Sequence, residues 1–302
     1  MIFSNINEKD ACFASKQKIS SATNKRRSNM MLNPLNLNHL NNISRSNADM
    51  ITLNLEDAIA PSRKREALEN IANFLSHNKN KNNSFIIVRT NPLNSGGYEE
   101  IKFLNEFDFD AIRLSKVKDQ NEISQALTLL KEDKELHISL ETKEAFENLS
   151  KLRIDERFTT ANLGILDLLT SLGLPQSIVR VNNPTIDYIL SKFLVDAKSA
   201  GIHPISFMFQ EYNDTHTFKA WCEHEKMMGF ESKACMGPKQ VLIANEIFGI
   251  NKYELERATY IKDIFELNST NNINGFMDDK YGFIDEPIYR DALLIKEKNE
   301  NF

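Results

Sequence analysis

The sequence has few cysteines, no long apolar run and no excess of positive charge, and each absence argues against a class of protein. Its three cysteines, Cys12, Cys222 and Cys235, show no paired spacing, so neither a disulfide framework nor a zinc site is indicated. No apolar run approaches membrane-spanning length, and the first residues lack the apolar core of a secretory signal. The net charge of −5 argues against a general nucleic-acid-binding protein. We therefore expect a protein of a reducing, cytoplasmic compartment that binds neither membranes nor nucleic acids.

The length and composition allow a large buried core. The chain has 302 residues, of which 41% are hydrophobic and 26% are charged. This length fits either two small domains or one (β/α) barrel. Residues 1–25 are rich in Ser, Asn and Lys, which predicts a mobile N-terminal tail. We predict a barrel domain over residues 26–265 and a C-terminal lid segment over residues 266–302, which is too short to fold alone.

Apolar runs alternate with helical patterns from about residue 28 to residue 248, without a linker or a break in composition. Residues 85–88 form a continuous apolar run, as expected of a strand that is covered on both faces. The predicted strands are residues 30–32, 51–55, 85–88, 111–116, 136–140, 160–165, 204–209 and 232–236. Eight strand–helix units favour a (β/α)8 TIM barrel with a C-terminal extension, while periodicity alone leaves a doubly wound sheet as the alternative.

Charged side chains stand at the ends of several predicted strands. The second strand runs directly into Glu56 and Asp57, and later strands end at Arg89, Glu141 and Asp167. Because α/β proteins carry their chemistry at the carboxyl ends of parallel strands, these side chains are expected to converge on one polar site. Taken singly, Glu141 or Asp167 could instead be an acid at a helix N-terminus, and Arg89 could form a structural ion pair.

Short motifs in a fixed order make the chain similar to a known family. These motifs are Leu55-Glu56-Asp57-Ala58, Val88-Arg89-Thr90-Asn91-Pro92, Leu114-Ser115-Lys116-Val117, Leu140-Glu141-Thr142, Gly164-Ile165-Leu166-Asp167-Leu168, Ala200-Gly201-Ile202, Gly229-Phe230-Glu231-Ser232-Lys233, Pro238-Lys239-Gln240-Val241 and Phe283-Ile284-Asp285-Glu286-Pro287. Over roughly residues 26–298 the chain resembles the HpcH/HpaI aldolase superfamily, in its branch similar to the citrate lyase β-subunit. The resemblance implies a TIM barrel, Mg²⁺, a homotrimer or hexamer, and aldol-type cleavage of a 3-hydroxyacyl thioester.

The matching motifs also imply roles for individual residues. Glu141 and Asp167 resemble the metal ligands of the family. Arg89 resembles the residue that binds the substrate carboxylate, and Lys116 is expected to contact the substrate as well. Asp285 matches the acid of the C-terminal lid, which in the family reaches an active site, often that of a neighbouring subunit. A surface turn is the alternative role for Asp285.

The two acids that end the second strand are assigned a supporting role. We expect Glu56 and Asp57 to orient Arg89, Lys116 or metal-bound waters rather than to bind the metal.

Cleavage of a carbon–carbon bond beside a carbinol leaves an enolate and a carbonyl, whose developing negative charge needs stabilisation. Mg²⁺ held by two carboxylates, waters and substrate oxygens can supply it.

The expected function is therefore that of a Mg²⁺-dependent carbon–carbon lyase, or its Claisen-direction reverse. The resemblance implies a short 3-hydroxy-dicarboxylyl thioester as substrate, such as citryl-, malyl- or citramalyl-CoA. The expected partners are a keto or hydroxy acid and a CoA or acyl-carrier thioester.

Several residues depart from the family pattern. They are Leu35 after Pro34, Ser115 in place of Pro, Leu166 in place of an acid, Ser206 in place of Asp, and Gly237 in place of His. Two alternatives follow from these departures: a catalytically weakened barrel that serves as a binding or assembly subunit, and a pyruvate-class aldolase that acts on a free acid.

Overall fold

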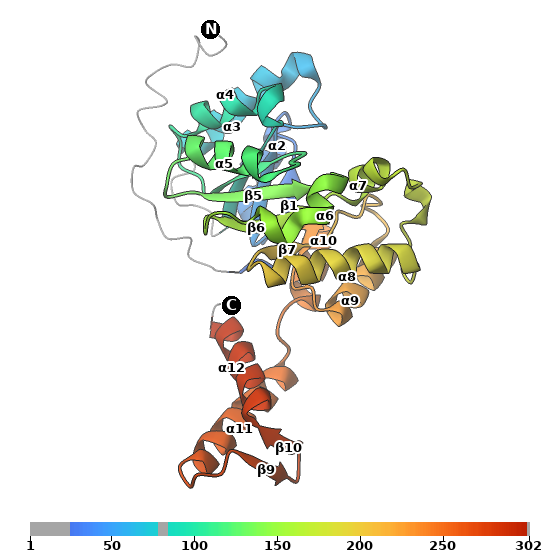
Figure 1. Cartoon of the computed structure of the whole chain (residues 1–302). Coiled ribbons are helices and arrows are strands. Elements are labelled where there is room, and N and C mark those ends of the chain that lie inside the picture. The colour runs from blue at the N-terminus through green and yellow to red at the C-terminus, as the bar shows by residue number, and fades with distance from the viewer. Residues whose placement is uncertain (1–24, 78–83, 301–302) are drawn as a thin grey trace. The chain divides into compact units, whose positions relative to one another are not determined.

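The computed structural model describes residues 25–77 and 84–300. The predicted mobile tail, apart from Lys25, and Cys12 lie outside the described residues. The chain divides into two compact units, one spanning Arg26–Phe248 and the other extending from Gly249 to the C-terminus (Figure 1). Each unit is described by itself below.

Eight parallel strands form the centre of the first unit. They are β1 Ser28–Leu32, β2 Met50–Asn54, β3 Phe85–Thr90, β4 Ala111–Leu114, β5 Glu135–Leu140, β6 Phe158–Leu163, β7 His203–Ile205 and β8 Lys233–Cys235. From β1 to β7 each strand pairs with the next one in sequence, and β1 also pairs with β8. The ring closes where Ser206, directly after β7, forms a parallel bridge with Lys233. The prediction of a (β/α)8 TIM barrel is confirmed, and the doubly wound alternative is wrong.

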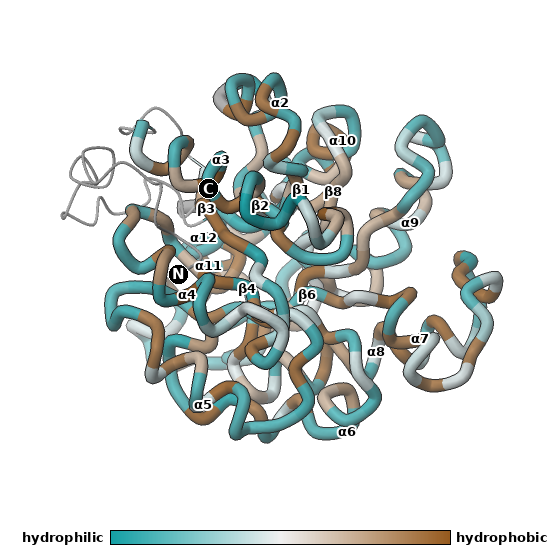
Figure 2. Tube along the Cα trace, turned by 90° about the horizontal axis from the view of Figure 1, so that it is seen from above, coloured by the Kyte–Doolittle hydropathy of each residue, from teal (hydrophilic) through white to brown (hydrophobic). Residues whose placement is uncertain are grey.

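Helices connect the strands and cover their outer face. They are α2 Leu37–Asn41, α3 Lys64–His77, α4 Gly97–Leu104, α5 Gln120–Leu129, α6 Lys143–Leu152, α7 Ile165–Leu172, α8 Pro184–Ser199, α9 Thr215–Met228 and α10 Pro238–Ile247, with short 3₁₀ turns at Ile43–Arg45, Pro61–Arg63, Leu93–Ser95 and Gln176–Ile178. Side-chain caps fix several starts: Asp119 accepts from two backbone N–H groups of α5, and Thr142 accepts from Ala145 N–H in α6. Hydrophobic and hydrophilic stretches alternate along these helices (Figure 2), as expected when one side packs on the strands. Within the described ranges, no helix is both long and apolar enough to cross a membrane.

The strands bury different side chains on their two faces. The larger apolar cluster contains Ile51 and Leu53 from β2 together with the buried sides of the surrounding helices. A smaller cluster consists of Met50, Phe85, Ile87, Ala111, Ile205 and Ala234, which alternate with the first set along the strands and fill the barrel interior. Two residues beyond Ile87 and Ala111 stand Arg89 and Arg113, which therefore point to the same interior. Along β3 and β4 the inner face thus changes from the apolar Ile87 and Ala111 to two arginines at the carboxyl ends.

A buried ion pair supports the closing bridge of the barrel. Lys233 in β8 and Glu225 in α9 are fully buried, and Lys233 Nζ lies 2.6 Å from Glu225 Oε1. Ser206 donates its hydroxyl to the same oxygen at 2.6 Å. Burial raises the pKa of Glu225, and the charge of Lys233 opposes that rise. These contacts hold α9 against the junction of β7 and β8.

The C-terminal unit has its own small core. Helices α11 (Lys252–Ser269) and α12 (Glu286–Glu300) pack together beside the antiparallel hairpin of β9 (Gly275–Asp278) and β10 (Gly282–Asp285). The rings of Phe265 and Tyr289 stack with centroids 4.4 Å apart. The sequence had suggested a boundary at residue 265, which falls inside α11. The compact unit begins instead at Gly249, because α11 packs on α12 and the hairpin.

We expect Lys233→Met to lower the free energy of unfolding by about 3–5 kcal/mol, because it leaves the Glu225 carboxylate buried without its cation. The double variant Lys233→Met/Glu225→Gln should recover part of this loss. Urea unfolding followed by circular dichroism measures both, with Lys252→Met, in an exposed ion pair, as the unchanged control. A single variant as stable as the wild type would contradict the structural role of the pair.

Candidate active site

The carboxyl end of the barrel contains a cavity of about 520 Å³. Its polar lining comes from several strands and the loops that follow them: Asn33, His39, Asn54, Asp57, Arg89, Arg113, Ser139, Glu141, Asn162, Asp167 and Gln210. Arg89, Glu141 and Asp167, which the sequence analysis assigned to carboxylate and metal binding, therefore share one cavity. Side chains that pointed to different sides of the barrel would have contradicted the predicted site.

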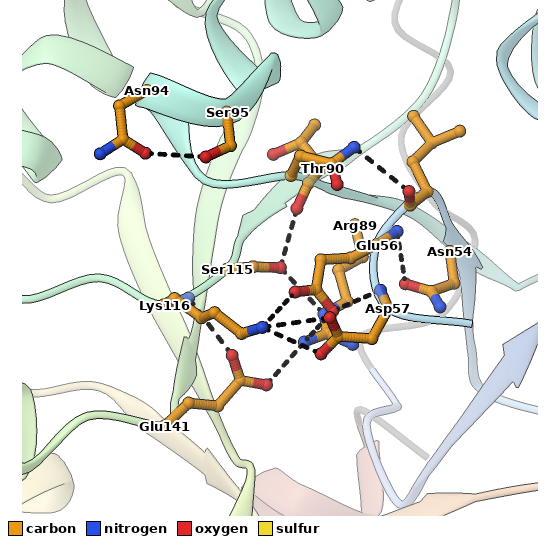
Figure 3. Close-up of polar contacts among 12 residues, drawn as sticks. Asn54, Glu56, Asp57, Arg89, Thr90, Asn94, Ser95, Ser115, Lys116 and Glu141 are labelled. Atoms are coloured by element: carbon orange, nitrogen blue, oxygen red, sulfur yellow. Dashed lines mark hydrogen bonds and ion pairs between the residues drawn. The ribbon is translucent and has the colours of Figure 1, made fainter. Parts of the chain in front are cut away.

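The Arg89 guanidinium lies between two buried carboxylates (Figure 3). Its Nη2 atom is 2.6 Å from Glu141 Oε1 and 3.0 Å from Glu56 Oε2. Its Nε donates to the Ser115 hydroxyl at 3.0 Å. Nη1 makes no hydrogen bond to the residues that the structure describes, so it is the nitrogen that remains for a ligand. Bidentate binding of a substrate carboxylate would also require Nη2, which already contacts the carboxylates of Glu56 and Glu141.

Glu56 connects the cations of two neighbouring strands. Its Oε1 is 2.9 Å from Lys116 Nζ, while its Oε2 contacts Arg89. Lys116 Nζ also lies 3.1 Å from both carboxylate oxygens of Asp57. Partial burial works against the charge of Lys116, but the hydrogen bonds to Glu56 and Asp57 raise its pKa above the usual value. Glu56 thus contacts Arg89 and Lys116, and Asp57 contacts Lys116, as their predicted orienting role requires.

Lys116 adopts a backbone conformation that is uncommon for a residue with a side chain. Its φ is +53°, in the left-handed region, two residues after the end of β4. Its backbone N–H donates to Glu141 Oε2 at 3.2 Å. The salt bridges of its side chain and this backbone bond hold the strained turn in place. Lys116 is not part of the cavity lining, and its contact with the substrate stays a prediction.

A glycine makes room for Glu141, the residue that follows β5. A Cβ atom at Gly164 would lie 2.3 Å from Glu141 Cγ, so a larger residue would displace the carboxylate. Burial raises the pKa of Glu141, the charge of Arg89 opposes the rise, and the charges of Glu56 and Asp167 add to it. The charge of Arg113 opposes the rise as well, so Glu141 lies among two cations and two acids.

Asp167 lies in the first turn of α7 and is exposed on the wall of the same cavity. A helix N-terminus favours an acid there, so the helix-terminal role and the metal role are compatible. Between residues 25 and 300, leaving aside the gap at 78–83, no group of three or more His, Cys, Asp or Glu side chains is arranged to hold a metal. Glu141 and Asp167 offer two carboxylates, which suits Mg²⁺ because this ion keeps several waters.

Three of the residues that depart from the expected pattern have local structural roles. Ser115 accepts from Arg89 and donates its hydroxyl to the Thr90 carbonyl at 2.7 Å. A Cβ atom at Gly237 would lie 2.9 Å from the ring of Tyr212, so the glycine allows that ring to pack closely. Ser206 takes part in the closure of the barrel, as described above. These substitutions are accommodated by specific contacts.

Asp285 belongs to the C-terminal unit, where it is the last residue of β10, directly before α12. Its Oδ1 accepts from the backbone N–H of Ile288 at 3.3 Å and so caps the start of α12. This local contact explains an acid at this position. Its role on a lid stays a prediction.

The sequence analysis missed Arg113 and Asn162, which both line the cavity. Arg113 Nη1 donates to Asn162 Oδ1 at 3.1 Å. The signal in the sequence was a charged residue inside the otherwise apolar strand β4, two positions before Ser115. A buried strand that carries a charge on its inner face usually serves a site.

The fold and the site define a (β/α)8-barrel protein whose cavity combines a guanidinium with two acids. The model of the HpcH/HpaI aldolase/citrate lyase family matches residues 27–238. The chain belongs to this family.

Similar proteins include a (3S)-malyl-CoA thioesterase of Cereibacter sphaeroides, 28% identical over 70% of this chain and 73% of its own length. An L-malyl-CoA/beta-methylmalyl-CoA lyase of Rhodobacter capsulatus is 25% identical over 68% of this chain and 73% of its own. The solved structure of CitE from Mycobacterium tuberculosis, in complex with magnesium, acetoacetate and coenzyme A, superposes with a TM-score of 0.72 and 15% identity. It covers 93% of this chain and 99% of that one.

We expect Arg89→Met to destabilise the protein, because it leaves Glu56 and Glu141 buried together without the cation between them. The pKa of Glu141 is raised in the folded state, so its stabilising contribution is present below its ordinary value of 4.5 and is lost as the pH rises through the folded value. Removal of Arg89 raises that pKa further. The loss of stability should therefore be larger at about pH 8 than at about pH 5.

Urea unfolding of wild type and Arg89→Met at both pH values, with a chelator present, measures this difference. Arg89→Met/Glu141→Gln is the matched control, since it removes one of the two carboxylates as well. Equal losses at both pH values would show that the charge of Arg89 is not what the two acids require.

Proposed function

We propose that this chain is a Mg²⁺-dependent carbon–carbon lyase that acts on a short 3-hydroxyacyl thioester of a dicarboxylic acid, such as citryl-, malyl- or citramalyl-CoA. The observation that carries the proposal is the presence of Arg89, Glu141 and Asp167 on the wall of one cavity at the carboxyl end of the barrel. The names of the malyl-CoA and methylmalyl-CoA lyases among its relatives support the reaction class.

Glu141 and Asp167 are the residues that would hold Mg²⁺. The raised pKa of the buried Glu141, to which Asp167 contributes, fits a site that is completed by a cation. Bound there, Mg²⁺ supplies charge that stabilises an enolate or a keto oxygen. The magnesium in the similar CitE structure supports the choice of metal.

The protein's own residues orient the acid. Arg89 offers Nη1 to a carboxylate while Nη2 stays bound to Glu56 and Glu141, so its position does not depend on the ligand. Lys116 and Asp57 hold Glu56 in turn. This prearranged set of charges lowers the reorganisation that binding and reaction require.

Hydrolysis of the same class of thioester is a second candidate function. The (3S)-malyl-CoA thioesterase among the similar proteins motivates it. The retained polar cluster disfavours a barrel that serves only as a binding or assembly subunit, and the CoA in the CitE structure favours a thioester over a free acid.

We also propose a cytoplasmic homotrimer or hexamer, in which Asp285 of the C-terminal unit acts at an active site.

We expect Mg²⁺ together with oxaloacetate, pyruvate or glyoxylate to raise the unfolding temperature, because these ligands bind only the folded state. Glu141→Ala should abolish the shift, since it removes one of the two metal-binding carboxylates. Differential scanning fluorimetry with and without Mg²⁺ measures it, and Glu147→Ala on the outer helix α6 is the matched control. The absence of a shift with every keto acid would contradict the proposal.

The two reactions on a thioester differ in their products. A lyase releases a keto acid and a shorter acyl thioester, whereas a thioesterase releases free CoA and a hydroxy acid. Incubation with malyl-CoA and citramalyl-CoA, followed by thiol detection and chromatography of the acids, separates them.

We expect Asp285→Asn to reduce turnover at least about tenfold if this acid transfers a proton. Unchanged turnover would leave Asp285 with its capping role alone.

A further inference from the structure

Arg113 is a buried cation without a carboxylate partner. Its side chain is 2% exposed, lines the cavity and forms no ion pair with any residue in the described part of the chain. Among the described residues, the side chain of Arg113 hydrogen-bonds only to the neutral Asn162, through Nη1. Burial and the neighbouring charge of Arg89 lower its pKa to about 9, so it remains charged at neutral pH.

The groups that contact the Arg113 side chain are neutral and leave hydrogen-bond donors unused, while the charges of Glu141 and Glu56 attract Arg113 without forming an ion pair with it. Asn162 Oδ1 accepts from both Arg113 Nη1 and Asn29 Nδ2, and Asn29 Oδ1 accepts from the Thr52 hydroxyl. Arg113 Nε and Asn162 Nδ2 are both buried without a partner. Two buried donors without partners, on two side chains that line the cavity, leave hydrogen-bonding capacity that suits an anion.

Arg113 and Arg89 are neighbours in the barrel but differ in their partners. They are paired in the register of β4 and β3, and each points to the interior. Arg89 is compensated by Glu56 and Glu141, whereas no carboxylate contacts Arg113. Glu141 and Glu56 attract Arg113 without contacting it, so its guanidinium keeps hydrogen-bonding capacity for a negatively charged ligand.

We infer that Arg113, with Asn162, forms a second carboxylate-binding subsite in this cavity and selects keto acids that carry a second carboxylate. This inference rests on the proposed function, and it narrows the acid half of the substrate to the oxaloacetate type. Pyruvate and glyoxylate have one carboxylate each and would leave Arg113 unpaired. Arg113 is therefore a specificity-determining residue.

The wild-type protein provides the first test. With Mg²⁺ present, isothermal titration should give a dissociation constant for oxaloacetate at least about tenfold lower than that for pyruvate, since a charge-assisted contact separates the two ligands. Equal affinities would overturn the inference while the proposed function stands. Binding of neither acid would contradict the proposed function and the inference together.

Variants at Arg113 provide the second test. Arg113→Met should weaken oxaloacetate binding about tenfold to a hundredfold and leave pyruvate binding nearly unchanged. Arg113→Lys should retain part of the preference, and Arg113→Gln serves if the Met variant does not fold. Lys134→Met is the control that should preserve the preference. It removes a buried lysine directly before β5, outside the cavity lining, that donates to the Phe109 carbonyl.

The stability of the ligand-free protein separates this role from a structural one. The unfolding temperature of Arg113→Met should lie close to that of the wild type, because the burial cost that the change relieves offsets the lost attraction to Glu141 and Glu56. A lower unfolding temperature with an unchanged preference between the acids would show that Arg113 supports the fold only. An equal weakening of both acids would show that it positions Arg89 and does not select the ligand.

Discussion

Arg89 shares its Nη2 atom between Glu56 and Glu141, and this contact joins the ends of β2, β3 and β5. Lys116, which follows β4, is joined to the same set by its salt bridge to Glu56 and by the hydrogen bond from its backbone N–H to Glu141. Two buried carboxylates so close together repel one another, and the Arg89 cation between them offsets this repulsion. The positions of four successive strand ends, and of the groups that face the cavity, depend on this arrangement.

The barrel uses buried charge in two distinct ways. At its closure, Lys233 and Glu225 satisfy one another and Ser206 completes the set, which serves the fold. In the cavity, Arg113 has no acid of its own and the exposed Asp167 adds negative charge beside Glu141. Charges that lack a contacting partner at the carboxyl end favour the binding of a metal ion and an anionic acid.

Much of the fold follows from local patterns. The continuous apolar run of β3 and the capping residues Asp119 and Thr142 specify strands and helix starts without any tertiary information. All eight strands lie within a few residues of their predicted positions. The boundary between the two units could not be predicted from local sequence patterns. The unit to which α11 belongs depends on its packing against α12, and the apolar residues of α11 alone suit either unit.

The sequence by itself determined the strand–helix alternation, and with it the acids and the arginine at successive strand ends, because periods of 2 and 3.6 residues are local properties. The family motifs assigned roles to Arg89, Glu141 and Asp167 but could not give their contacts. Only the tertiary structure decided that Arg89 keeps one nitrogen for a ligand, that Gly164 makes room for Glu141, and that Arg113 lies buried without a carboxylate. These facts depend on which side chains meet across strands far apart in the sequence, and no local pattern encodes that.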